Sequence, residues 1–147
     1  MKSNYKLFQI VFICSVAIWL WPGCRSKQTL FEKIPSSHSG IYFNNGITET
    51  DSINPLHVVN VYNGGGVGIG DFNDDGLPDI YFTGNMVSNK LYLNKGDFKF
   101  EDVTLKAAVG GDGRWARGVA VIDINNDGLM DMYICNTIYK DTARRTN

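Results

Sequence analysis

Two segments rich in acidic and amide side chains carry the clearest chemistry in this sequence. Residues 71–79 and 123–131 share the pattern D-x-N-x-D-G-L-x-D and begin 52 residues apart. Side chains at positions 1, 3 and 5 of such a loop can converge on one point, and a glycine at position 6 permits the sharp turn this requires. Carboxylate and amide oxygens are the ligands of a hard cation such as Ca²⁺. The pattern therefore predicts about two Ca²⁺ ions per chain, one in each loop.

The predicted ligands occupy the same positions in both copies. Positions 1, 3 and 5 would supply side-chain oxygens, and position 7 would supply its backbone carbonyl while its side chain faces the core. A carboxylate at position 9 would complete the set. These residues are Asp71, Asn73, Asp75, Leu77 and Asp79 in the first copy, and Asp123, Asn125, Asp127, Leu129 and Asp131 in the second.

An EF-hand shares the start of this pattern but requires a Glu at position 12 and flanking helices. Position 12 is Phe82 in one copy and Ile134 in the other. The flanking runs 67–70, 80–83, 119–122 and 132–135 are short and have strand character, so each loop is expected to join two strands. A plain hairpin turn is the remaining alternative, although such a turn requires no Asp at positions 1 and 9.

The elements around the loops also repeat. Residues 40–49 resemble 90–104, since both show a strand ending in Asn (Asn44 or Asn94), a Gly turn and a second short strand. The sequence pattern of each unit thus predicts about four short antiparallel strands in roughly 50 residues, which is the size of a β-propeller blade. Gly68 and Gly70 fall on one strand face, which indicates the close approach of a neighbouring sheet.

Residues 70–79 with the glycine-rich entry before them, 89–96 and 100–104 resemble the FG-GAP/VCBS repeats of integrin-α-like propellers. Residues 113–121 resemble the blade entry of bacterial proteins related to the cartilage-acidic-protein and ASPIC/UnbV group. The resemblance implies an all-β fold over residues 37–147, a partial β-propeller of about two and a half four-stranded blades, and Ca²⁺ in the acidic loops. Such propellers usually close with more blades. We therefore favour an N-terminal fragment of a longer protein; assembly from several copies and a partial sheet are the alternatives.

The first 24 residues have the features of a targeting segment. Lys2 and Lys6 precede a mostly apolar stretch at 7–21, which suits a secretory signal and is short for a membrane span. Gly23 before Cys24 resembles the lipobox of bacterial lipoproteins, although Trp21 and Pro22 depart from it. We expect a signal peptide over 1–24 that forms a helix, lipidation at Cys24 and a polar tether over 25–36. An uncleaved anchor or an ordinary signal peptide is the alternative.

Composition narrows the function classes. The net charge is −1 and no basic patch is present, so nucleic acid is not an expected partner. His38 and His57 are the only histidines and neither adjoins an acidic pair, so no catalytic residues are predicted. Cys135, the one cysteine beyond the predicted lipidation site, is expected to be buried. Trp115, between two arginines, is expected to pack between blades, with a partner contact as the alternative.

Together these features predict an exported, lipid-anchored bacterial protein, periplasmic or at the outer membrane and cell surface. Its expected role is a non-catalytic, Ca²⁺-binding β-propeller module that binds an unidentified protein or glycan. Its membrane contact would be the acyl anchor. The alternative is an accessory or scaffold part of a Ca²⁺-dependent polysaccharide-acting enzyme.

Overall fold

A computed structural model describes residues 29–58 and 60–137. The chain divides into two parts, with the boundary between Lys33 and Ile34. Residues 29–33 of the first part are exposed, and the second part contains every helix and strand described below. The predicted signal peptide and the predicted lipidation at Cys24 lie outside the described residues. No helix within the described ranges is long and apolar enough to cross a membrane.

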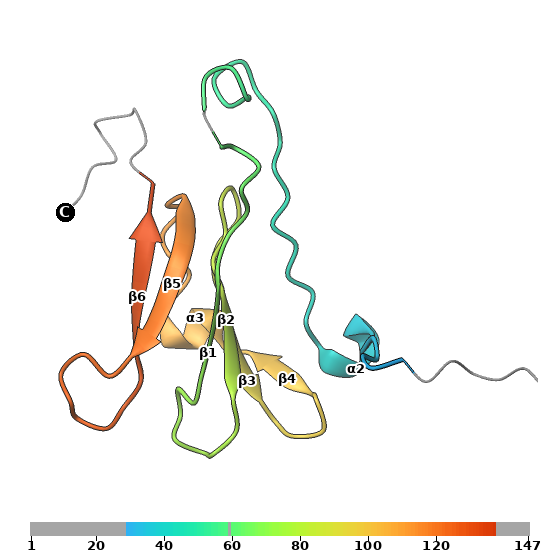
Figure 1. The fold of residues 1–147 in the computed structure, drawn as a ribbon, viewed down its shortest axis with the longest axis vertical. Coiled ribbons are helices and arrows are strands. Elements are labelled where there is room, and N and C mark those ends of the chain that lie inside the picture. Colours follow the sequence, from blue (N-terminus) through green and yellow to red (C-terminus); the bar gives the residue numbers. More distant parts are fainter. Residues whose placement is uncertain (1–28, 59, 138–147) are drawn as a thin grey trace, which may run out of the picture. The chain divides into compact units, whose positions relative to one another are not determined.

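Four short strands form one antiparallel sheet in chain order (Figure 1). They are β1 (Val67–Gly70), β2 (Asp79–Phe82), β3 (Lys90–Asn94) and β4 (Phe100–Asp102). A tight turn around Gly96, whose φ is 80°, joins β3 to β4. The predicted strand–loop–strand–connection–strand–turn–strand order is confirmed for this repeat. We call it the first sheet.

A second antiparallel sheet consists of β5 (Ala116–Ile122) and β6 (Asp131–Asn136), with an irregularity in register between Ala116 and Val119. Two short helices complete the described elements, α2 (Ser36–Ser39) and α3 (Thr104–Ala107). The acidic loops join β1 to β2 and β5 to β6, and Figure 1 shows both at the same end of the sheets. Strand flanks on both loops confirm that neither is an EF-hand.

Residues 40–49 form no strand, so the predicted hairpin at this position is wrong. The segment is extended, and side chains hold it instead of a backbone ladder. Phe43 stacks on Phe82 with ring centroids 4.9 Å apart. Asn45 exchanges two hydrogen bonds with Asn85, of 2.7 and 2.9 Å. A strand requires a parallel or antiparallel neighbour for its backbone groups, and this segment meets the side chains of a sheet face instead.

The hydrophobic core lies between the two sheets. Its buried centre is Tyr81, Leu91 and Val103, and partly buried side chains from both sheets pack against it, namely Phe72, Leu93, Val109, Val119, Met132 and Ile134. A Cβ added at Gly68 or Gly70 would lie 2.9 or 2.7 Å from a methyl group of Val121. The close approach predicted from these glycines is confirmed, and the neighbouring sheet is the one formed by β5 and β6.

Three expectations about single side chains have different outcomes. Trp115 is buried, as expected for packing between repeats. Cys135 is exposed, so its predicted burial is wrong. The side chain of Leu129 is also exposed and does not face a core. The exposure of Cys135 has a physical cause: within the described residues no third sheet packs against the outer side of β5 and β6.

Candidate metal-binding loops

Backbone N–H groups fix the carboxylates of the first acidic loop, residues 71–79. Asp71 accepts hydrogen bonds from the N–H groups of Asp75 and Gly76, at 3.1 and 2.7 Å. Asp75 accepts one from the N–H of Leu77 at 2.9 Å and one from the amide of Asn73 at 2.8 Å. The structure therefore brings positions 1, 3 and 5 together in one hydrogen-bonded turn.

The second acidic loop, residues 123–131, repeats this arrangement. Asp123 accepts from the N–H groups of Asp127 and Gly128, at 3.1 and 2.8 Å. Asp127 accepts from Leu129 at 2.8 Å and from the amide of Asn125 at 2.9 Å. The glycine at position 6 has a left-handed φ in both loops, 81° and 89°, where a residue with Cβ would be strained. The repeated sequence thus encodes one repeated local structure.

The carboxylate at position 9 has a different environment. Asp79 is fully buried and accepts hydrogen bonds from the N–H groups of Phe72 and Asn94, at 2.9 and 2.8 Å. It therefore joins the start of the loop to the end of β3. Asp131 accepts the equivalent bond from Ile124 at 3.0 Å but is only partly buried. This anchoring role was missed by sequence reasoning, which considered Asp79 only as a ligand.

Hydrogen bonds to the loop carboxylates favour their charged forms. The N–H of Gly76 is the main cause that lowers the pKa of Asp71 below its ordinary value. The N–H of Leu129, followed by the amide of Asn125, lowers the pKa of Asp127. A hydrogen bond to a carboxylate stabilises the ion relative to the acid. Both loops therefore hold ionised oxygens at neutral pH.

The donor set of each loop fits a hard cation in chemical type. A carboxylate has about four lone-pair positions, and the bonds described above occupy only part of them at Asp71 and Asp123. In residues 29–58 and 60–137, however, no three His, Cys, Asp or Glu side chains are grouped so that they could hold a metal ion. The structure thus assembles positions 1, 3 and 5, while it assigns the carboxylate of Asp79 to backbone N–H groups.

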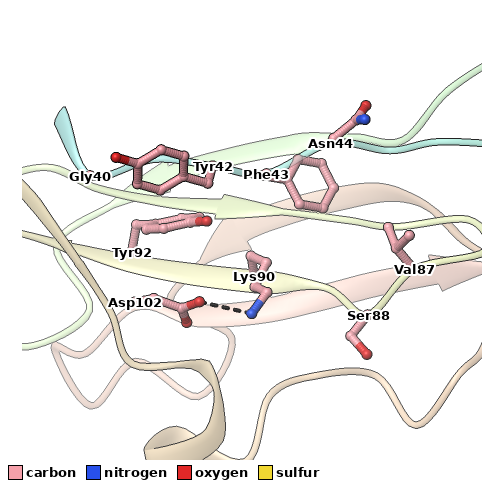
Figure 2. A pocket seen from close by; sticks show the side chains of 9 residues that line it. All are labelled: Gly40, Tyr42, Phe43, Asn44, Val87, Ser88, Lys90, Tyr92 and Asp102. Atoms are coloured by element: carbon pink, nitrogen blue, oxygen red, sulfur yellow. Dashed lines mark hydrogen bonds and ion pairs between the residues drawn. The ribbon is translucent and has the colours of Figure 1, made fainter. Parts of the chain in front are cut away.

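A groove between residues 40–44 and the first sheet was not found from the sequence. Figure 2 shows its lining, which comes from the extended segment (Gly40, Tyr42, Phe43 and Asn44) and from the first sheet and its connection (Val87, Ser88, Lys90, Tyr92 and Asp102). The aromatic pair at 42–43 was the available signal, but it was assigned to a strand. Tyr42 remains largely exposed, whereas Tyr92 is buried.

An ion pair lies in this groove, between Lys90 Nζ and Asp102 Oδ2 at 2.8 Å (Figure 2). The hydrogen bond to Asp102 raises the pKa of Lys90. Burial alone would raise the pKa of Asp102, but hydrogen bonds from Lys90 and Thr104 outweigh it and the pKa is lowered. Asp102 therefore takes part in a charge pair on the lining of the groove.

Comparison with known proteins agrees with the repeat seen in the fold. Residues 71–134 match the sequence model of the FG-GAP-like repeat. The chain is 34% identical to cartilage acidic protein 1 of Xenopus tropicalis and 35% identical to that of Homo sapiens, each over 79 residues. These regions cover 53% of this chain and 12% of each relative, so the chain corresponds to a small part of their length. No solved structure matches the chain. Residues 71–134, which span both acidic loops and most of both sheets, therefore carry an FG-GAP-like repeat.

Proposed function

We propose that this protein is an exported, lipid-anchored and non-catalytic Ca²⁺-binding module, built as a partial β-propeller, that binds a protein or glycan at a bacterial cell envelope. The observation that carries the Ca²⁺ part is the pair of acidic loops, in which positions 1, 3 and 5 make the same hydrogen bonds. Their carboxylates are held in place by backbone N–H groups of the same turn, so little ordering would be needed for binding.

The charge of each loop also supports a cation. Asp71, Asp75 and their counterparts Asp123 and Asp127 are held close together, with no lysine or arginine among the residues of either loop. Like charges at short range repel one another, and a divalent cation offsets this repulsion. We expect Asn73 and Asn125 to supply amide oxygens and Leu77 and Leu129 to supply backbone carbonyls. A bound ion would bridge the turn and stabilise the connection between paired strands.

Calorimetry and thermal melting test the Ca²⁺ assignment. The 147-residue protein should bind Ca²⁺, and EDTA should lower its melting temperature. The double variant Asp75→Ala, Asp127→Ala should lose most of the binding. The matched control is Glu101→Ala, which removes an exposed carboxylate outside the loops. Equal Ca²⁺ binding by the double variant and the control, or a melting temperature that EDTA leaves unchanged, would refute the assignment.

The groove of Figure 2 supports the interaction role. Its rim has an exposed aromatic ring, Tyr42, beside the Lys90–Asp102 ion pair. Aromatic faces with nearby polar groups suit both peptide and sugar ligands. Tyr42→Ala should reduce retention of the protein on immobilised polysaccharides or envelope proteins, with Tyr62→Ala as the control at another exposed tyrosine. Equal retention of both variants would place the contact elsewhere.

A further inference from the structure

The sequence contains two Asn–Gly pairs, Asn45–Gly46 and Asn63–Gly64. An asparagine before glycine is prone to deamidation, because glycine has no Cβ to hinder attack by its backbone nitrogen on the preceding side chain. In both pairs a Cβ added to the glycine would meet nothing within 4 Å. The N–H groups of both glycines also make no hydrogen bond in the described part of the chain. The chief difference between the pairs therefore lies in how each asparagine side chain is held.

Two hydrogen bonds hold the side chain of Asn45. Its Nδ2 donates to Oδ1 of Asn85 at 2.7 Å, and its Oδ1 accepts from the backbone N–H of Asn85 at 2.9 Å. Asn85 is itself fixed, since it is 3% exposed and its Nδ2 donates to the carbonyl of Ala116 at 2.8 Å. Deamidation requires the side chain of Asn45 to leave Asn85 and turn toward the nitrogen of Gly46. Loss of the two bonds should slow the reaction by about tenfold or more.

The side chain of Asn63 has no such restraint. It is exposed and makes no hydrogen bond to any residue of 29–58 or 60–137. Its backbone is held, because the N–H of Asn63 donates to the carbonyl of Asn60 at 3.1 Å. That carbonyl also accepts from both terminal nitrogens of Arg117, each at 3.2 Å. The backbone turn is thus fixed to β5, while the amide group can rotate toward the nitrogen of Gly64.

We propose that Asn63 is a site of spontaneous deamidation, and that Asn85 protects Asn45 from the same reaction. The backbone nitrogen of Gly64 loses its proton and attacks Cγ of Asn63. A C–N bond forms, and the side-chain amide nitrogen leaves as ammonia, which yields a cyclic imide. Water then opens the ring at either of its carbonyls and leaves aspartate or isoaspartate. The reaction involves no oxidation, and water is its only co-reactant.

The modification changes both the charge and the length of the connection that leads into β1. A carboxylate replaces a neutral amide, so the net charge of −1 becomes more negative. Isoaspartate also adds the side-chain Cβ to the main chain. The connection beyond Gly64 is tightly packed, since a Cβ at Gly65 would lie 2.0 Å from the carbonyl oxygen of Thr83, and one at Gly66 would lie 2.8 Å from that of Arg117. We therefore expect Gly64 and the turn before it to accommodate the longer main chain.

Peptide mass spectrometry of the 147-residue protein tests this inference. The folded protein is incubated in mildly alkaline buffer and digested briefly at acidic pH, where the reaction is slow. Asn63 should convert about tenfold faster than Asn45 or more, whereas the two rates should approach each other in denaturing urea. Asn63→Gln should remove the main acidic product in isoelectric focusing, because the longer side chain cyclises slowly, and the control Asn45→Gln should leave it. Equal rates at both sites in the folded protein, or conversion of Asn63 in urea alone, would overturn the inference.

Two substitutions at Asn85 test the protection of Asn45. Asn85→Ala removes the acceptor for Nδ2 of Asn45, so deamidation at Asn45 should rise several-fold. Asn85→Asp is the matched control, because it keeps that acceptor while both variants lose the donor to the carbonyl of Ala116. The rate at Asn63 in the same sample shows whether a variant is folded, since it should equal that of the wild type. An unchanged rate at Asn45 in Asn85→Ala, or an equal increase in both variants, would overturn the protective role of Asn85.

Discussion

Replacing Gly70 by alanine tests whether the two sheets pack as the structure describes. The added Cβ would lie 2.7 Å from Cγ1 of Val121, with Phe72 and Met130 at 3.7 and 3.8 Å. Optimal separation between carbon atoms is about 3.5–4.0 Å, so the new methyl overlaps one neighbour by about 1 Å. Val121 has a stiff χ1 torsion because it is β-branched. The strand and its partner sheet would therefore have to separate.

Two opposing effects determine the expected change in the free energy of unfolding of Gly70→Ala. Overpacking of this kind costs about 1–3 kcal/mol. Replacing glycine also restricts the unfolded chain, which returns about 0.4–1 kcal/mol. The net loss should be about 1–2 kcal/mol. In urea, with a slope of about 1–3 kcal/mol per molar, the unfolding midpoint should fall by roughly 1 M.

Two comparisons make the urea experiment specific. Gly46→Ala is the matched control, since a Cβ there meets nothing within 4 Å and its φ is not left-handed; it should leave stability unchanged or slightly raised. Val121→Ala removes the clashing methyl, so adding it to Gly70→Ala should recover part of the loss in a double-mutant cycle. Equal midpoints for Gly70→Ala and Gly46→Ala would refute the contact between β1 and β5.

The remaining predictions concern three other sites. Asp79→Asn should lower the free energy of unfolding by about 1–3 kcal/mol, because an amide nitrogen would face a backbone donor. Asp131→Asn should lower it less, because Asp131 is partly exposed. Equal losses for the two variants in urea unfolding would contradict the anchoring role of Asp79. Trp115→Ala should destabilise by about 3–5 kcal/mol as a buried side chain, and an unchanged melting temperature would favour a surface contact instead. The lowered pKa values of Asp71 and Asp102 provide stability that is present above their ordinary value of 3.8 and lost as pH falls through the lower folded values. The melting temperature should therefore decrease as the pH drops below about 4, and this decrease should be less steep in Asp102→Asn. An equally steep decrease in the variant would argue against the contribution of Asp102.

Local sequence determined the parts of this protein that depend on near neighbours. The acidic loops were predictable because their hydrogen bonds join residues two to five apart in the chain, as between Asp71 and Gly76. The strands that flank them were predictable for the same reason, since alternation of side chains and turn residues is a short-range pattern. Gly68 and Gly70 also indicated that a neighbouring sheet would approach.

Tertiary structure decided the features that differ between segments with similar sequence patterns. Tyr81 and Tyr133 occupy identical positions in their repeats, yet one is buried and the other exposed, because in the part of the chain that the structure describes a sheet packs over Tyr81 alone. Residues 40–49 resemble a strand pair in sequence, but they lie over side chains that offer no backbone ladder. Asp79 matched a ligand position, and only the arrival of Asn94 from β3 gave its carboxylate a second partner. Burial and long-range hydrogen bonds depend on which segments meet in space, and that information is not contained in either repeat alone.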